Sequence, residues 1–300
     1  MKYLVTGGAG FIGSHLVDAL LVAGHQVRVI DNFLTGKREN LNPLAELFEV
    51  DIRDLEKIKP AFVGMDGVFH TAALPRVQVS IQNPLETNEI NITGALNVIL
   101  AARDAKIKRL IYSASSSAYG DPIELPLAES MKPNPKSPYG LQKYVGEEYA
   151  KLAALFYNLE TVSLRYFNVF GSRMANDGAY CTVIAVFLKQ RKEGKQLTIY
   201  GDGTVTRDFT HVRDVVRANI LAMESVKVGK GEVINIGAGS NHSVREVAEM
   251  IGGEITYLPP RVEPHDTLAD NTLAREFLDW TPQVDFKDGI EELKRLNNIV

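Results

Sequence analysis

"VTGGAGFIG", residues 5–13, places Gly7, Gly10 and Gly13 between a short apolar run and an amphipathic segment. The apolar run at 3–6 predicts a buried strand, and the apolar residues from Phe11 to Leu21 recur at helical spacing until Gly24. Glycines at such a junction permit a tight turn that brings backbone N–H groups and the positive end of the helix dipole against a phosphate. The stretch therefore predicts a strand, a turn and a helix that together bind an anionic ligand.

The same alternation of buried strand and amphipathic helix continues through the first half of the chain. A helix is expected over 85–105, and another should begin with Ser137 as N-cap and Pro138 in its first turn and run over 139–157. Alternating strands and helices indicate a parallel sheet with right-handed crossovers. The further predicted strands lie at 26–31, 47–50, 67–71, 109–113 and 161–165.

The pattern changes after Asn168, where Gly, Asn and Asp crowd residues 171–179 and the later elements become shorter. We therefore expect an α/β protein with a Rossmann-type doubly wound parallel sheet over residues 1–170 and a smaller C-terminal α/β substrate-binding lobe over 171–300. A segment at about 207–238 is a candidate to return to the first domain. Ser243 and Glu246 form a capping-box pattern that predicts the start of a helix at Val244.

Composition excludes several classes of function. The net charge of −4 offers no basic stripe for nucleic acid, and no window has the roughly 18 apolar residues of a membrane span. The opening MKYLVTGG has too short an apolar run for a signal peptide, so we expect a cytoplasmic protein. Cys181 is the single cysteine, and the six histidines lack metal-ligand spacing, so neither a disulfide nor a metal is expected.

Asp31 makes the expected ligand more specific. It follows Gly13 by eighteen residues and ends the second predicted strand, where a ribose 2′-hydroxyl of a dinucleotide would lie. A carboxylate there repels a 2′-phosphate, so NAD is favoured over NADP. Asp51 and Ile52 follow the third predicted strand and are candidates to flank the adenine, although a charged loop is an alternative explanation of this stretch.

Tyr139 and Lys143 are four residues apart on one predicted helix face, and Ser115 ends the fifth predicted strand. A tyrosine becomes a base near neutral pH when positive charge lowers its pKa of about 10 by roughly 3 units. Lys143 would supply such charge, and Ser115 would hydrogen-bond the substrate oxygen that loses its proton. This spacing arises on surface helices by chance, but its order after the glycine turn favours catalysis.

Six motifs together resemble the extended short-chain dehydrogenase/reductase family, and within it the UDP-hexose 4-epimerases, including the branch that acts on UDP-N-acetylhexosamines. The resemblance covers nearly the whole chain and implies an NAD-binding Rossmann domain followed by a lobe for the UDP-sugar. The motifs are TGGAGFIG at 6–13, HTAA at 70–73, SASSSAYG at 113–120, SPYGLQK at 137–143, RYFNVFG at 165–171 and YGDGTVTRDFTHVRD at 200–214.

The resemblance implies a role for individual residues. Tyr139 matches the base, Lys143 its partner and Ser115 the neighbouring hydroxyl, with Ser116 and Ser117 beside the substrate. The implied NAD contacts are Gly7, Gly10, Phe11, Ile12, Gly13, Asp31, Asn32, Asp51, Ile52, Thr71, Ala72, Ala73, Ser113, Tyr139, Lys143 and Tyr166. The implied UDP-sugar contacts include Asn168, Thr182, Val183, Thr198, Tyr200, Arg207, Arg261, Asp266 and Thr267, although Arg207 and Arg261 also suit surface salt bridges.

Two departures from the family pattern affect the expected substrate. The stretch PPRVEPHDTLAD is one residue short before LAD, which leaves the register of Arg261 and Asp266 open. The related 4,6-dehydratases carry Asp-Glu where this chain has Ser116 and Ser117, so elimination of water lacks its acid and base. The implied reaction is epimerisation at C4 through a transient 4-keto sugar.

Alternatives remain at this point. Another NAD-dependent sugar-nucleotide oxidoreductase or a UDP-glucuronate 4-epimerase of the same family would share these motifs, and a non-catalytic NAD sensor would need only the glycine turn. The sequence leaves the sugar open among hexose, N-acetylhexosamine and hexuronic acid. The resemblance implies a homodimer in which the helices over 85–105 and 139–157 of one subunit pack against the same two helices of the other subunit as a four-helix contact.

Overall fold

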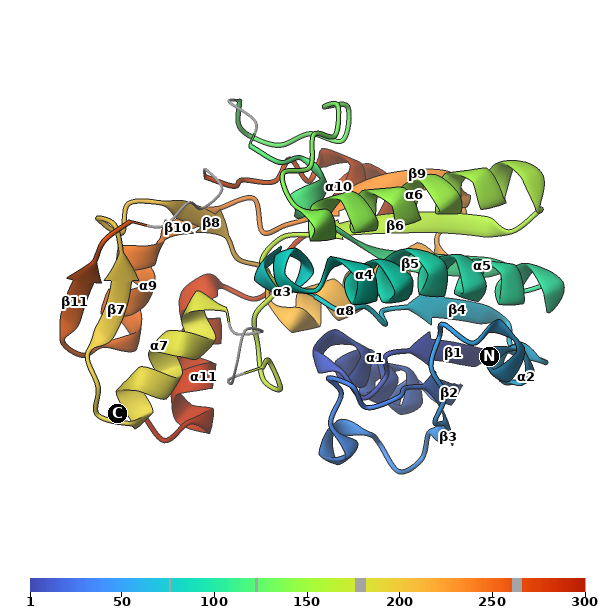
Figure 1. Cartoon of the computed structure of the whole chain (residues 1–300), viewed down its shortest axis with the longest axis horizontal. Coiled ribbons are helices and arrows are strands. Elements are labelled where there is room, and N and C mark those ends of the chain that lie inside the picture. The colour runs from blue at the N-terminus through green and yellow to red at the C-terminus, as the bar shows by residue number, and fades with distance from the viewer. Residues whose placement is uncertain (76, 122–123, 176–181, 261–265, 300) are drawn as a thin grey trace.

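The computed structural model describes residues 1–75, 77–121, 124–175, 182–260 and 266–299. Its larger lobe is built on a seven-stranded sheet in the order β3-β2-β1-β4-β5-β6-β9, and every neighbouring pair is parallel (Figure 1). The strands are β1 Lys2–Thr6, β2 Gln26–Ile30, β3 Glu46–Phe48, β4 Gly67–His70, β5 Arg109–Ser115, β6 Glu160–Tyr166 and β9 Lys230–Ile236.

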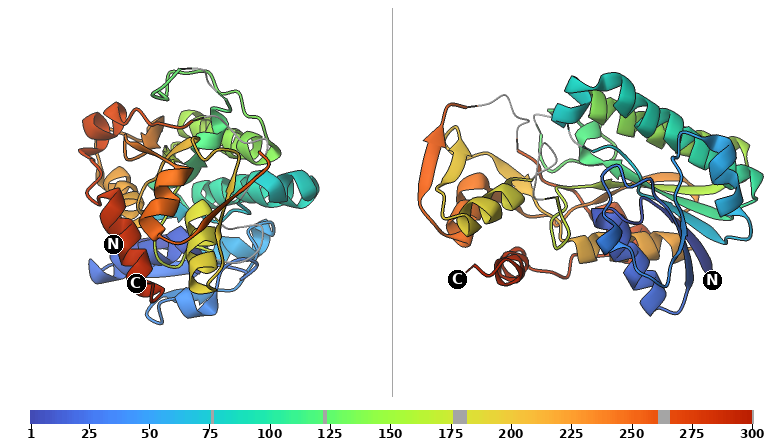
Figure 2. Two further views of the ribbon diagram at one scale, coloured as in Figure 1. Left: turned by 90° about the vertical axis from the view of Figure 1, so that its left-hand side faces the viewer. Right: turned by 60° about the horizontal axis from the view of Figure 1, so that its bottom comes forward.

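Helices cover both faces of this sheet, as the right-hand view of Figure 2 shows. One face carries α1 (Phe11–Val22), α8 (Val212–Glu224) and α10 (Thr272–Leu278). The other carries α2 (Leu55–Phe62), α5 (Ala95–Asp104) and α6 (Pro138–Phe156). Short helices α3 (Val77–Gln82) and α4 (Pro84–Asn88), the π-turn η2 (Glu89–Gly94), and the 3-10 turns η1 (Arg38–Asn40) and η3 (Ser116–Ala118) complete this lobe.

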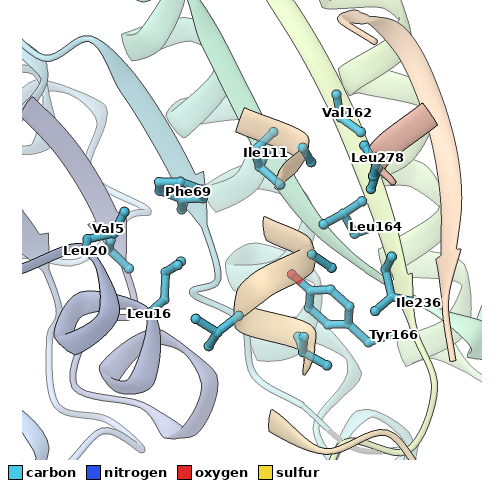
Figure 3. Packing of buried hydrophobic residues seen from close by; sticks show 14 of the residues in the cluster. Val5, Leu16, Leu20, Phe69, Ile111, Val162, Leu164, Tyr166, Ile236 and Leu278 are labelled. Carbon is cyan, nitrogen blue, oxygen red and sulfur yellow. The ribbon is translucent and has the colours of Figure 1, made fainter. Parts of the chain in front are cut away.

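Two apolar layers hold the larger lobe together. Figure 3 shows the first, in which strand residues such as Val5, Phe69 and Leu164 pack against Leu16 of α1 and Leu278 of α10. The second layer packs the opposite face of the sheet against α2, α5 and α6. Strands with apolar residues on both faces are those expected of a parallel sheet between two helical layers.

The smaller lobe has its own core and two short sheets. Strands β7 (Leu197–Tyr200) and β11 (Ile255–Leu258) pair in parallel, and β8 (Thr206–Asp208) pairs with β10 (Asn241–Ser243) in antiparallel fashion. Helices α7 (Val183–Lys192), α9 (Val244–Ile251) and α11 (Phe286–Leu296) pack over them. In Figure 1 this lobe lies at the left, beyond the C-terminal ends of the large sheet.

The predicted Rossmann-type sheet with a smaller C-terminal α/β lobe is confirmed. Ser137 caps α6 by accepting the Gly140 N–H at 3.1 Å, and Ser243 and Glu246 form the predicted capping box of α9.

The helix predicted over 85–105 is not one regular α-helix, because η2 separates α4 from α5. Asn91 lies within this interruption, and its side chain accepts from the Leu74 N–H at 2.7 Å and donates to the Leu74 carbonyl at 3.0 Å. A π-turn inserts one extra residue, and here it accompanies an inward-facing asparagine.

Candidate active site

A cavity of about 870 Å³ lies at the C-terminal ends of the central strands. In doubly wound sheets ligands bind at this edge. Every residue that the sequence suggested for the cofactor lines it: Gly7, Gly10, Phe11, Ile12, Gly13, Asp31, Asn32, Asp51, Ile52, Thr71, Ala72, Ala73, Ser113, Tyr139, Lys143 and Tyr166. Of the residues suggested for the substrate, Ser115, Ser116, Ser117, Tyr139, Asn168, Arg207 and Thr267 line the same cavity.

The glycine turn is sterically fixed. Gly7 has φ +73°, and a Cβ placed on it would lie 2.8 Å from the Cα of Ala72. A Cβ on Gly13 would lie 2.1 Å from the Gly7 carbonyl oxygen, so the helix can approach the turn only without that atom. No side chain caps the N-terminus of α1, whose first residues Phe11 and Ile12 line the cavity. The backbone N–H groups at this uncapped helix start can bind the pyrophosphate of a dinucleotide.

Asp31 is held rigidly at the cavity wall. Its carboxylate oxygens accept the backbone N–H of Ala9 at 2.9 Å and of Phe33 at 2.8 Å. Burial raises the pKa of Asp31, and these two hydrogen bonds act against the rise. A fixed carboxylate at this position can accept hydrogen bonds from ribose hydroxyls.

Asp51 is oriented by two neighbours. Arg53 pairs with its carboxylate at 2.7 Å, and the Asn32 side chain donates to it at 2.8 Å. The hydrogen bond from Arg53 is the largest cause of the lowered pKa of Asp51. Asn32, Asp51 and the buried Ile52 therefore form one continuous part of the wall.

The tyrosine and lysine of α6 both reach the cavity. Lys143 is 4% exposed, and its Nζ lies 4.8 Å from the ring centroid of Tyr112. Burial lowers the pKa of Lys143 to about 8, while the charge of Glu147 acts in the opposite direction. A buried ammonium interacts more strongly with a nearby phenolate than an ammonium in water does.

The serine block continues the wall at the end of β5. Ser115 Oγ accepts hydrogen bonds from the backbone N–H of Ser117 at 3.2 Å and from its hydroxyl at 2.8 Å. Ser117 thereby orients the lone pairs of Ser115 and leaves the Ser115 proton available for another acceptor.

Ser113 lies deeper. Its hydroxyl is 3.0 Å from that of Tyr166, which donates to Asn219 at 2.9 Å. Burial raises the pKa of Tyr166 to about 12, so this second tyrosine stays protonated at neutral pH.

Arg207 and Thr267 reach the cavity from the side of the smaller lobe, where they meet Asn168, which follows β6 of the larger sheet. The Asn168 amide donates to Thr267 Oγ1 at 3.2 Å and to the Asp208 carbonyl at 2.8 Å. The Asp208 N–H also donates to Thr267 Oγ1, at 3.2 Å. The Thr267 hydroxyl therefore accepts two hydrogen bonds and has its direction fixed.

Asp208 is a residue that the sequence reasoning missed. Its buried carboxylate accepts the backbone N–H of Ala238 at 2.7 Å and those of Gly239 and Ala269 at 3.0 Å. Burial raises the pKa of Asp208 to about 6, against the effect of these three donors. Asp208 joins segments that come from β8, the end of β9 and the chain before α10. The sequence shows that Asp208 follows Arg207, but it does not show which N–H groups the Asp208 carboxylate accepts.

The remaining suggested substrate residues lie elsewhere. Thr198 accepts from the Gln190 side chain, Thr182 caps α7, and Val183 packs on the core of the smaller lobe. Asp266 accepts the Thr206 N–H at 2.6 Å, Tyr200 lines a separate hollow of about 700 Å³, and Arg261 lies outside the described residues.

A buried polar network behind α6 was also missed. Asn91 donates to Gln142 at 2.9 Å, and Gln142 donates to Thr87 at 3.0 Å. Ser80 accepts the backbone N–H of Tyr139 at 3.0 Å. In the sequence these four residues carried no motif. Together they tie the start of α6 to α3, α4 and η2.

Two kinds of feature are absent from the described part of the chain. None of its helices is long and apolar enough to cross a membrane. Within the same residues, no three His, Cys, Asp or Glu side chains are grouped so as to hold a metal ion.

Comparisons with known proteins agree with this geometry. The model of the NAD dependent epimerase/dehydratase family matches residues 3–237. The UDP-glucose 4-epimerase of Mycolicibacterium smegmatis is 36% identical over 97% of this chain and 96% of its own length.

Two solved structures are similar over nearly their full length. The UDP-glucose 4-epimerase of Thermotoga maritima, solved with UDP-glucose, has a TM-score of 0.94 and 38% identity, with 99% of both chains covered. The UDP-N-acetylglucosamine 4-epimerase of Methanobrevibacter ruminantium, solved with UDP-N-acetylmuramic acid, has a TM-score of 0.92 and 37% identity, with 98% of this chain and 97% of that chain covered. The resemblance noted in the sequence is thus confirmed, and the chain belongs to the NAD dependent epimerase/dehydratase family.

Proposed function

We propose that the protein is an NAD-dependent 4-epimerase of UDP-hexoses. The observation that carries this proposal is one cavity that joins an uncapped helix start and a fixed Asp31 to Tyr139, Lys143 and Ser115. Similarity to UDP-hexose 4-epimerases over almost the whole chain supports it. We assign NAD to the larger lobe, and the UDP-sugar to the junction with the smaller lobe, where Asn168, Arg207 and Thr267 lie.

In this proposal the reaction proceeds through an oxidised sugar. Tyr139 takes the proton of the substrate 4-hydroxyl, and Ser115 donates a hydrogen bond to the same oxygen. The turn at Gly7, Gly10 and Gly13 together with Asp31 would hold NAD, which would supply a hydride acceptor for C4 and would return the same hydride to the opposite face of the 4-keto sugar. Tyr139 then gives its proton back to the oxygen at C4. Lys143 supplies positive charge that favours the ionised phenol.

Residues 116 and 117 carry hydroxyl groups where a dehydratase needs an acid and a base. Elimination of water from C5 and C6 requires an acid and a base near the hydroxyl residue, and Ser116 and Ser117 stand there. The cavity lining at this point carries hydroxyls from residues 115–117. We therefore expect the product to keep its 6-hydroxyl.

The test uses the purified protein without added NAD. UDP-glucose should be converted to UDP-galactose, and one equivalent of NAD should be recovered from the denatured protein. Tyr139→Phe should retain NAD and lose turnover by orders of magnitude. A requirement for NAD in every turnover would indicate a net oxidoreductase, a 4-keto-6-deoxy product would indicate a dehydratase, and conversion restricted to UDP-glucuronate would identify the alternative epimerase.

We also propose that the protein is a homodimer that packs α4, α5 and α6 against their copies. Leu152, Leu155 and Phe156 on α6 are 46%, 71% and 69% exposed, and Leu85 on α4 is 81% exposed. Figure 1 shows these helices side by side on one face of the larger lobe. Leu152→Glu should convert the dimer to a monomer in analytical ultracentrifugation, and an unchanged mass for this variant would place the contact elsewhere.

A further inference from the structure

Tyr112 on β5 lies directly against Lys143 without lining the cavity. Its ring centroid is 4.8 Å from the Lys143 Nζ, and its hydroxyl donates to the Lys143 carbonyl oxygen at 3.4 Å. Tyr112 is 1% exposed and is not among the residues that line the cavity. Its contacts with Lys143 therefore involve both the charged end and the backbone of that residue.

Gly146 allows this arrangement. A Cβ at Gly146 would lie 2.1 Å from the Tyr112 hydroxyl oxygen, closer than side-chain carbons approach such an atom. The phenol therefore fits into a notch in α6 that only glycine provides. This notch lies within one turn of Lys143, so the position of Tyr112 sets how closely this part of α6 approaches β5.

The ammonium has no carboxylate partner among the described residues. Glu147 on the same helix acts on Lys143 through its charge, but both of its carboxylate oxygens are held by Arg165, at 2.9 and 2.7 Å. His70 on β4 carries no charge to pair with, because burial, followed by the charge of Lys143, lowers its pKa to about 3. Tyr139, one helical turn before Lys143 on α6, also lines the cavity, as does Tyr166 at the end of β6, which burial keeps protonated by raising its pKa to about 12.

We propose that Tyr112 is a positioning residue for Lys143, and that the negative face of its ring holds the buried ammonium at the cavity wall that Lys143 shares with Tyr139. A ring face attracts a desolvated cation through its quadrupole, most strongly where water is excluded. This inference rests on the proposed roles of Tyr139 as base and of Lys143 as its partner.

The consequence is a defined change in ionisation. Without the ring, the charged form of Lys143 is less favoured, and less positive charge acts on the Tyr139 phenol. The pKa of Tyr139 should then rise, and the acidic limb of the pH–rate profile should move to higher pH. If Tyr112 served only to pack the core, its replacement would lower the stability of the protein without moving the acidic limb of the pH–rate profile.

The experiment compares Tyr112→Phe with Tyr112→Leu in the enzyme that retains its copurified NAD. Tyr139 ionisation is followed as the ultraviolet phenolate signal of each variant minus that of the same variant carrying Tyr139→Phe. Tyr112→Phe, which keeps the ring, should titrate like the wild type. Tyr112→Leu should titrate about one pH unit higher, and its turnover at pH 7 should fall by about tenfold.

A matched control separates the effect from the loss of core packing. Phe69→Leu removes a buried ring from the neighbouring strand β4, on the face of the sheet that packs against α1. It should lower the melting temperature and leave the Tyr139 titration unchanged. An unshifted titration in Tyr112→Leu, or an equal shift in Tyr112→Phe, would overturn the proposal.

A series of fluorinated variants tests the same proposal even if Tyr112→Leu does not fold. Phenylalanine analogues with one, two and three ring fluorines at position 112 weaken the negative ring face with little change of volume. The Tyr139 titration should move upward with each fluorine, and a constant midpoint would refute the role of the ring. Turnover by the Tyr139→Phe enzyme would instead refute the proposed base, whichever result the series gives.

Discussion

The hydroxyl of Ser80 on α3 accepts a 3.0 Å hydrogen bond from the backbone N–H of Tyr139, the second residue of α6. The same hydroxyl donates to the Val77 carbonyl at 2.7 Å, which fixes its direction. The first N–H groups of a helix have no intrahelical partner, and here a second helix supplies one. Ser80 thus ties the proposed base to a helix whose residues Val77 and Ile81 line the cavity.

Ser80→Ala should lower both stability and turnover. Loss of the cap should reduce the free energy of unfolding by about 1 kcal/mol. A small displacement of Tyr139 should reduce kcat by about tenfold, because catalysis depends steeply on the placement of the base. Denaturant unfolding, steady-state kinetics and the NAD content of the purified variant measure these effects, and the NAD content should not change.

Ser243→Ala is the matched control. Ser243 caps α9 in the smaller lobe, away from the cavity, and its loss should cost similar stability. Turnover by this variant should equal that of the wild type. Equal turnover in the Ser80 and Ser243 variants would show that the cap on Tyr139 does not position the base.

The sequence predicted those structural features that depend only on residues close together in the chain. The start of α6 at Ser137 and Pro138 and the capping box at Ser243 each involve groups within three residues of one another. The glycine turn was equally local, since Gly7 and Gly13 contact one another across a single turn.

Features that depend on distant partners were not predictable in this way. Asp208 accepts N–H groups from residues 238, 239 and 269, which the sequence separates from it by 30 residues or more. Gln142 looks like an ordinary helix residue until Thr87 and Asn91 are placed beside it. Thr198 was suggested for the substrate through resemblance alone, and nothing in the sequence indicated that its hydroxyl accepts from the Gln190 side chain. In each case tertiary packing selected the partner.

Asp31 should determine the choice of dinucleotide. The wild type, freed of NAD, should bind NAD much more tightly than NADP, because the fixed carboxylate repels a 2′-phosphate. Asp31→Asn removes the charge and should narrow this preference by about tenfold or more. Calorimetric titration with both dinucleotides measures the ratio of the two affinities.

Glu49→Gln is the control. It removes one negative charge from an exposed ion pair with Arg38 and should leave the ratio of the NAD and NADP affinities unchanged. Equal affinity of the wild type for both dinucleotides would contradict the assignment.

His70 should make the protein less stable in mild acid. Its Nδ1 lies 2.7 Å from Thr6 Oγ1, and burial, followed by the charge of Lys143, lowers its pKa to about 3. In the unfolded chain a histidine has a pKa of about 6.5. Between these values the unfolded state binds more protons, so stability is lost as pH falls below about 6.5.

The variant His70→Asn removes this titration. The slope of the unfolding free energy against pH should become flatter by up to about 1.4 kcal/mol per pH unit between pH 4 and 6. Urea unfolding of both proteins at half-unit steps of pH measures the slope. Their difference at pH 7.5 isolates the change in packing, because the imidazole is then neutral in both states. Parallel curves across the acidic range would mean that His70 is protonated in the folded protein.

Thr267 should determine which sugars enter the cavity. The resemblance to the UDP-hexose 4-epimerases implies that Thr267, the residue before LAD, faces the C2 substituent of the hexose; Thr267 lines the cavity, and its small side chain would leave room for an acetamido group. We expect the wild type to convert UDP-N-acetylglucosamine alongside UDP-glucose. Thr267→Tyr should depress kcat/KM for the N-acetylated substrate by about 100-fold relative to UDP-glucose, because a steric clash discriminates strongly between substrates.

The structure requires a second variant to interpret that result. Thr267 Oγ1 accepts from the Asn168 side chain and from the Asp208 N–H, each at 3.2 Å, so tyrosine removes an acceptor as well as adding a ring. Thr267→Val removes the acceptor at nearly constant volume. It should lower activity on both sugars equally, and only Thr267→Tyr should change their ratio. Equal losses in Thr267→Tyr would place the C2 substituent away from this residue, whereas a wild type inert towards UDP-N-acetylglucosamine would mean that another part of the wall excludes the acetamido group.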